Sequence, residues 1–322
     1  MDLVQHIASR NSFLAKMKTA QDRLQTLATA LQHVKSEPPA PALAYYYQSY
    51  AYQRTKELSL IGKRLYDLRL ELLKIDQILQ LHRPRNWPPG TPYPDEFQEI
   101  SRSGSEVDDQ IVLDFQTFLI FTGIILDDWA HLAGCVLGAP NPTKCTFDKI
   151  VRGDGHDVFK TLWDEHKASI LWLDAFPRLY RNKVIVHREK PWQLGHTRSL
   201  AFLDWSFFTP VPVGWLSDER ASELRMTLEK IAERVGADLS QNNHRLLLDA
   251  FGKIEELDKE ERRTLYDLAL DIGFHTPSFQ QYAHRLADFL IAATDTLIRS
   301  ASADPAAINY GHFLVNGAVN GP

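Results

Sequence analysis

The stretch LSLIGKRLYDLRLELLKIDQIL, residues 58–79, decides the fold. Its apolar side chains recur at alternating steps of three and four residues, which is the spacing of one face of an α-helix. A seam this regular packs against another helix, either inside one chain as a bundle or between two chains as a coiled coil, and we favour the bundle. The seam consists of Leu58, Ile61, Leu65, Leu68, Leu72, Ile75 and Leu79.

Helical spacing extends to most of the chain. Prolines interrupt it after the first helix and fill a loop at residues 84–97, and no convincing strand alternation is present. Ser105 and Asp108 resemble a capping box that opens the third helix, and residues 192–215 read as an irregular connection with a short helix at 197–207. The expected helices span residues 1–35, 43–82, 105–137, 156–176, 217–235, 258–273 and 277–300, which predicts an all-α, up-and-down helical bundle.

Composition and charge narrow the functional classes. The 322-residue chain has a formal net charge of -5, which argues against a protein that coats nucleic acid non-specifically but leaves room for a local basic site. It has only two cysteines, which favours a reducing compartment. The longest apolar run, residues 111–126, is interrupted by Asp114 and Gln116 and reads as a core helix. We therefore expect a soluble, cytoplasmic protein without a membrane span.

Several familiar catalytic patterns are missing from the sequence. It has no phosphate-binding P-loop, no dinucleotide-binding glycine pattern and no G-x-S-x-G nucleophile turn. Asp128 and His131 stand three residues apart, as in di-metal helical bundles, but no second pair with matching placement accompanies them. The sequence therefore predicts neither a metal nor another cofactor.

One short segment is strongly basic within this acidic chain. Residues 178–198 hold six arginines and lysines against one acidic side chain, Glu189, which gives a local charge of +5. Such a concentration of cations attracts phosphate oxygens, although most charge clusters are simply solvated helix faces. The six cations are Arg178, Arg181, Lys183, Arg188, Lys190 and Arg198, and His187 and His196 lie among them.

Within this segment, Arg181-Asn182, four further residues and His187 resemble the arginine–histidine motif of HEPN-domain proteins, in the form with asparagine after the arginine. The apolar filler between Lys183 and His187 and the Arg188–Pro191 exit are also similar to many members. The resemblance covers residues 43–205. It implies a HEPN-type bundle at 43–215, with an N-terminal helix and proline linker at 1–42 and a helical extension or second subdomain at 216–322.

The resemblance implies metal-independent RNA cleavage, in which the 2′-hydroxyl attacks the adjacent phosphodiester. The family pattern makes His187 the proton-transfer residue, Arg181 the phosphate stabiliser and Asn182 the positioning group, and these residue types suit that chemistry. Asp127 and Asp128 are candidates for a supporting acidic residue on an earlier helix. The RNA-binding candidates are Arg178, Lys183, Arg188 and Lys190.

Helix geometry places a constraint on this motif. Six residues of α-helix turn by about 600°, so Arg181 and His187 would project about 120° apart and about 9 Å apart along the axis. A second copy across a two-fold axis could complete the site, and HEPN proteins are typically dimers whose motifs face one cleft. We therefore expect a homodimer.

Three functions remain open at this stage. The first is an endoribonuclease of toxin or defence type, with an RNA substrate and an antitoxin or other protein as its partner. The second is a non-catalytic HEPN module that binds RNA, a nucleotide or a partner protein. The third is a helical scaffold in which Arg181 and His187 are an incidental pair at a helix end.

Overall fold

The computed structural model describes residues 3–32, 40–82, 94–152, 156–175, 195–196, 207–209, 216–272, 274–275 and 278–303. Helices account for most of these residues, and the three strands are only two or three residues long. The longer helices are α1 (Leu3–Gln32), α2 (Ala40–His82), α3 (Asp95–Val136), α5 (His156–Leu173), α6 (Asp218–Arg234), α7 (Asn243–Gly252), α8 (Lys259–Ile272) and α9 (Phe279–Ala303). The prediction of an all-α helical bundle is confirmed.

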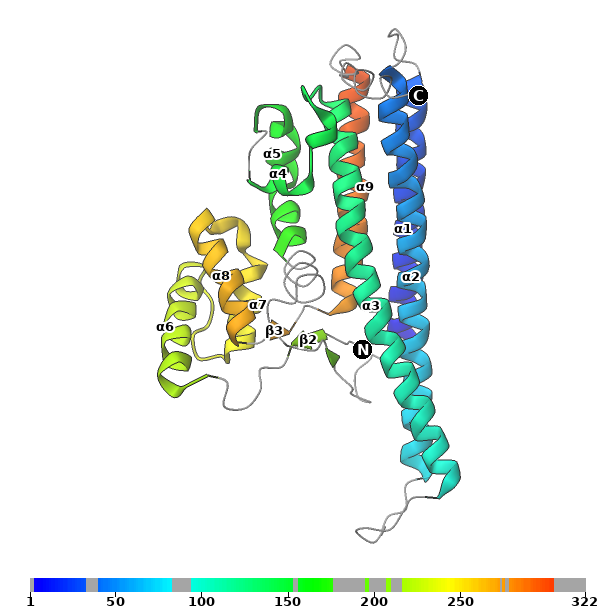
Figure 1. The fold of residues 1–322 in the computed structure, drawn as a ribbon, viewed down its shortest axis with the longest axis vertical. Helices are drawn as coiled ribbons and strands as arrows, with labels where there is room; N and C mark the ends of the chain where they lie inside the picture. Colours follow the sequence, from blue (N-terminus) through cyan, green and yellow to red (C-terminus); the bar gives the residue numbers. More distant parts are fainter. Residues whose placement is uncertain are drawn as a thin grey trace, which may run out of the picture.

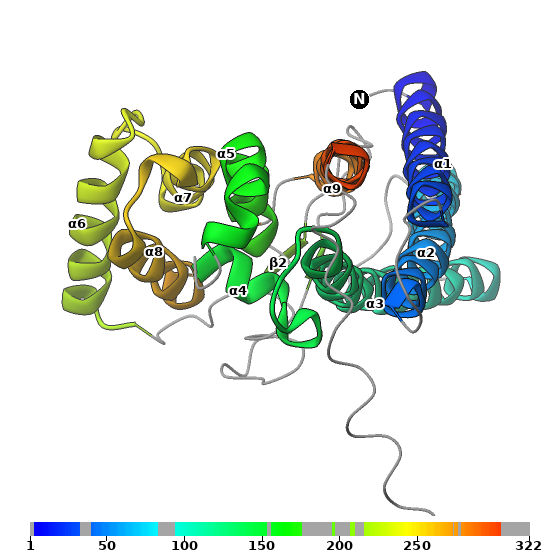
Figure 2. The same cartoon turned by 90° about the horizontal axis from the view of Figure 1, so that it is seen from above.

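Helices α1, α2, α3 and α9 form the bundle at the centre of the protein. Helix α1 packs against α2 and α9, and α3 packs against the same two helices, so the four close into a ring. Figure 1 shows α2 and α3 continuing beyond the other two helices as a projecting pair. Helices α6, α7 and α8 form a separate group, and Figure 2 shows α4 and α5 between that group and α9.

The first and last described helices lie side by side and run parallel. Lys16 pairs with Asp288 at 2.8 Å, and Arg23 pairs with Asp295 at 3.0 Å, so residue numbers rise together along α1 and α9. The first three helices run up, down and up, as predicted. Helix α9 then joins parallel to α1 and α3, because the chain makes a long excursion through α4–α8 before it returns.

The aromatic ring of Phe279 joins three helices of the bundle near the start of α9. Its ring centroid lies 5.3 Å from that of Tyr66 on α2, and 6.2 Å and 5.3 Å from those of Phe115 and Phe118 on α3. Edge-on aromatic pairs of this kind add to the free energy gained by burial. The first turns of α9 are therefore fixed in the core.

The apolar seam of α2 packs within the same chain. Leu58, Leu65 and Leu72 are completely buried, and the other seam residues are partly buried. Helix α2 runs antiparallel to α3: Tyr47, near the start of α2, stacks on His131, near the end of α3. The bundle interpretation of the seam is thus confirmed for this protein.

The predicted start of the third helix is wrong. Ser105 was expected to cap it, but α3 begins at Asp95, immediately after Pro94. The hydroxyl of Ser105 donates to the carbonyl of Ser101, four residues earlier in the same helix. The first turns of α3 are polar, so their sequence gives only a weak helical signal. They form a helix because they pack against the C-terminal end of α2.

The sequence pattern did not predict two short helices or the three strands. The short helix α4 spans Phe147–Arg152, and α7 is only ten residues long. The strands β1 (Gly195–His196), β2 (Phe207–Thr209) and β3 (Phe274–His275) form one antiparallel sheet in that order. Phe207 therefore lies in a strand, whereas the rest of the predicted helix at 197–207 falls outside the described residues.

Contacts in the bundle cross both predicted domain boundaries. Helix α1 belongs to the predicted segment 1–42, and it packs along α2 and α9. Helix α9 belongs to the predicted segment 216–322, and it completes the bundle with α1 and α3. The part of 216–322 that stands apart in Figures 1 and 2 is the group α6–α8.

Candidate functional site

The motif that suggested a function lies outside the described residues. This applies to Arg181, Asn182 and His187, and equally to the RNA-binding candidates Arg178, Lys183, Arg188 and Lys190. The structure does describe the chain on both sides of the segment 176–194. The described residues nearest to the motif in the sequence are these two flanks. The acidic candidates Asp127 and Asp128 on α3 are also described.

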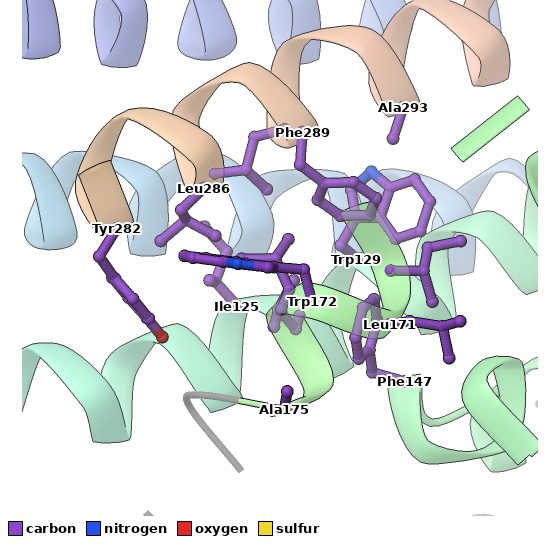
Figure 3. Packing of buried hydrophobic residues seen from close by; sticks show 14 of the residues in the cluster. Ile125, Trp129, Phe147, Leu171, Trp172, Ala175, Tyr282, Leu286, Phe289 and Ala293 are labelled. Atoms are coloured by element: carbon purple, nitrogen blue, oxygen red, sulfur yellow. The ribbon is translucent and has the colours of Figure 1, made fainter. Parts of the chain in front are cut away.

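The preceding flank is the end of α5, which is buried against α9 and α3. Trp172 is 3% exposed and Ala175 is fully buried. The Trp172 ring lies 5.5 Å from the ring of Tyr282 on α9, measured between centroids. Figure 3 shows Trp172 and Ala175 among the buried side chains of α3 and α9, directly before the segment that holds the motif.

An arginine covers this flank. The guanidinium carbon of Arg285 on α9 lies 4.6 Å from the centroid of the Trp172 ring, which is a cation–π contact. Burial lowers the pKa of Arg285, and the charge of Glu255 partly opposes that shift. Arg285 was not selected from the sequence, because nothing in the sequence indicates that the face of α9 carrying it meets Trp172.

The following flank enters the small sheet. Gly195 pairs with Phe208, and His196 pairs with Phe207, which places β1 beside β2. Strand β2 in turn pairs with β3, which ends at His275, four residues before α9 begins at Phe279. Of the described flanks, the one that ends at Ala175 therefore packs against the first turns of α9, and the one that begins at Gly195 belongs to the sheet that precedes α9.

Asp127, one of the two supporting candidates, has a structural partner. Its carboxylate oxygen Oδ1 accepts the backbone N–H of Phe147 at 3.0 Å, at the first residue of α4. The first N–H groups of a helix have no partner within it, so an acceptor from another element caps this end. Asp127 thus joins α3 to the start of α4, whatever else it does.

Asp128, the other candidate, lies between α3 and α2. It is half-buried, and burial raises the pKa of its carboxyl, while the positive charge of Arg54 lowers it and Asp127 raises it further. Arg54 itself pairs with Glu57 at 2.7 Å. Desolvation therefore favours the protonated form of the Asp128 carboxyl.

His131 is partly buried against an aromatic ring, and both cysteines are buried in the core. The imidazole of His131 stacks on Tyr47 with centroids 4.8 Å apart, and burial lowers its pKa despite the charge of Asp127. Cys135 and Cys145 are buried, and burial raises the pKa of Cys135 to about 12, which disfavours the reactive thiolate. In the described part of the chain, no group of three or more histidine, cysteine or acidic side chains could hold a metal ion.

No protein-family model matches the chain, and no characterised protein or solved structure is significantly similar to it. Among the described helices, α3 is long and apolar enough to cross a membrane by length and composition alone, and half of its most apolar window is buried. Core helices of globular proteins pass the same test, so this is weak evidence for a membrane span.

Proposed function

We propose that this protein is a metal-independent endoribonuclease of HEPN type. The observation that carries the proposal is the sequence Arg181-Asn182 followed after four residues by His187, inside a segment with a local charge of +5. An imidazole, a guanidinium and an amide are the groups that RNA transesterification needs, since they can move a proton, stabilise a phosphate and position the substrate. Toxin or defence activity and a cytoplasmic location belong to the same proposal.

The proposed reaction needs no group besides the RNA and the protein. The RNA 2′-oxygen loses its proton to a base and bonds to the adjacent phosphorus, while the bond from phosphorus to the 5′-oxygen breaks and that oxygen takes up a proton. The products are a 2′,3′-cyclic phosphate end and a 5′-hydroxyl end. His187 transfers the proton, and Arg181 stabilises the charge that grows on the phosphate oxygens.

The flanks of the segment support this proposal. Catalytic groups act best when rigid elements hold them. The segment leaves a buried helix end at Trp172 and Ala175, and it enters a sheet next to the start of α9. The described chain is thus anchored in packed or paired structure both before and after the segment that holds the motif.

A homodimer is the assembly that we propose. Because Arg181 and His187 would diverge on one straight helix, each site would draw on both copies. A mixture of His187→Ala and Arg181→Ala subunits should then regain part of the activity that neither variant has alone. A monomer in light scattering, or no regain after mixing, would contradict the shared site.

The decisive experiment is cleavage of a structured RNA in the presence of EDTA. We expect the unmodified protein to leave cyclic phosphate ends, and His187→Ala to abolish cleavage. Arg263→Ala is the matched control for Arg181→Ala, because Arg263 is an exposed arginine on α8. Cleavage that survives in His187→Ala, or that needs a divalent ion, would contradict the proposal. RNA binding without cleavage, weakened by Arg181→Ala, would favour the non-catalytic binding module instead.

A further inference from the structure

Arg285 differs from every other charged residue of α9 in its surroundings. Asp288 pairs with Lys16, Asp295 with Arg23, and Arg299 with Glu165 at 2.6 Å. Within the described residues, Arg285 has no carboxylate at ion-pair distance, and its guanidinium instead lies over Trp172. A stacked guanidinium keeps its N–H donors, which lie in its own plane, available for a further acceptor.

Tyr282 is a second polar residue of α9 that contacts the Trp172 ring. It is 1% exposed, and its hydroxyl has no hydrogen-bond partner among the described residues. The Tyr282 ring contacts Trp172, the residue on which Arg285 stacks, and Phe118 on α3, with centroids 5.5 Å and 6.0 Å apart. Figure 3 shows its hydroxyl pointing from α9 toward α3.

Chain length limits how far the first residue of the basic segment can lie from Ala175. Trp172 stands one helical turn before Ala175, and Arg178 follows Ala175 by three residues. A chain cannot extend by more than about 3.6 Å per residue, so Arg178 begins within roughly 11 Å of Ala175 whatever its conformation. Arg285 thus stacks on a residue that stands six positions before Arg178, where the most basic segment of the sequence begins.

We infer that Arg285, stacked on Trp172, forms a phosphate-binding subsite for single-stranded RNA, next to the proposed catalytic motif. This inference rests on the proposed function for the identity of its ligand. The fork of N–H donors on a guanidinium matches two phosphate oxygens. The subsite would hold a nucleotide that flanks the cleaved bond, and it would act on affinity rather than on proton transfer.

The test measures RNA affinity as a function of salt, in a His187→Ala background so that the probe stays intact. The probe is a fluorescein-labelled single-stranded RNA. Arg285→Gln keeps a flat polar group on Trp172 but removes the charge, and Arg263→Gln on α8 is the matched control. For single-stranded RNA, each phosphate contact contributes about 0.7 to the slope of log affinity against log salt.

We expect Arg285→Gln to lower that slope by about 0.7 and to weaken binding by about tenfold at low salt, which is about 1.4 kcal/mol. Arg263→Gln should change neither quantity. Arg285→Lys should keep the slope and lose part of the affinity, because it keeps the charge without the fork. An unchanged slope in Arg285→Gln, an equal change in Arg263→Gln, or no RNA binding at all would overturn the inference.

The outcome separates the two proposals. Cleavage that depends on His187, together with an unchanged slope in Arg285→Gln, would leave the nuclease standing and remove the subsite. A reduced slope in Arg285→Gln, in a protein that never cleaves RNA, would keep the subsite and remove the nuclease. Thermal unfolding of each variant confirms that the compared proteins are equally folded.

Discussion

Gly62 on α2 leaves the space that the ring of Phe13 on α1 occupies. A methyl group built on Gly62 would lie 2.5 Å from Cε1 and 2.7 Å from Cζ of Phe13, and Phe13 is completely buried. Alanine favours a helix by about 1 kcal/mol over glycine, but overpacking a core costs about 1–3 kcal/mol. The close approach of α1 and α2 thus depends on the missing side chain.

Gly62→Ala should therefore lower the free energy of unfolding by roughly 1 kcal/mol, the difference between these two effects. Urea denaturation measures it. Gly252→Ala is the control, because nothing lies within 4 Å of the methyl group that it adds at the end of α7. If Gly62→Ala is as stable as Gly252→Ala, then α1 and α2 do not approach as closely as described.

Asp127→Ala should destabilise the protein by about 1 kcal/mol, the usual cost of losing a helix cap. Its carboxylate accepts the N–H of Phe147, and Asp127→Asn keeps an oxygen in that place. Asp127→Asn should therefore retain most of the stability lost in Asp127→Ala. Its effect on RNA cleavage then tests the supporting role without a folding defect: unchanged cleavage in a stable Asp127→Asn protein leaves Asp128 as the only acidic candidate.

His6 should make the protein less stable in mild acid. Its pKa is lowered by burial first, opposed by its hydrogen bond to the carbonyl of Tyr66, and lowered further by Arg69 and Arg10. Because Nε2 donates to that carbonyl at 3.1 Å, an added proton would sit on Nδ1, which has no hydrogen-bond partner among the described residues. The neutral form is therefore favoured in the folded protein.

The sign of the pH effect follows from that preference. The unfolded chain binds a proton near its ordinary pKa of about 6.5, whereas the folded protein does so only at lower pH. Stability from His6 is thus present above about pH 6.5 and is lost as the pH falls toward the folded pKa, with a slope of at most about 1.4 kcal/mol per pH unit. The measurement is the urea midpoint of wild type and of His6→Gln at several pH values across this range. If the two midpoints change with pH in parallel, His6 does not contribute this pH dependence.

Thr296→Val should cost about 0.5–1.5 kcal/mol, because it removes a buried hydroxyl that bonds to two side chains of α5. The Thr296 hydroxyl donates to Glu165 at 2.7 Å and lies 2.9 Å from Nε2 of His166, which joins α9 to α5. Thr294→Val is a closely matched control, since Thr294 is equally buried but its hydroxyl bonds only to the carbonyl of Leu290 in its own helix. Equal losses in the two variants would contradict a specific joint between α5 and α9.

The long helices could be predicted because their apolar residues repeat over many turns. Leu58, Leu65 and Leu72 indicated one face of α2 in this way, and the helix expected at 217–235 matches α6, where the Ser217 hydroxyl accepts the N–H of Arg220. Helix α7 was missed, although Asn242 caps it, because ten residues offer too few repeats. Periodicity reports one helix at a time, so the pairing of α1 with α9 could not be predicted from it.

In the candidate site, too, local patterns could be predicted from the sequence and contacts between distant residues could not. The pattern of Arg181, Asn182 and His187 is visible in the sequence because it is local. The contact between Arg285 and Trp172 is not visible there, since 112 residues separate them along the chain. Asp127 and Asp128 are adjacent in the sequence, but their surroundings differ: Asp127 accepts an N–H at the start of α4, whereas burial and the charge of Arg54 govern the pKa of Asp128.

The neighbouring positions of α1 and α9 have a consequence for synthesis of the protein on the ribosome. Helix α1 leaves the ribosome long before its partner, because residues 279–303 of α9, which cover one of its sides, follow α1 only after all the other described helices. A nascent chain that stalls before those residues keeps the apolar side of α1 open to water and to chaperones. If the protein is a nuclease, its helical bundle is completed only after α9 has been synthesised.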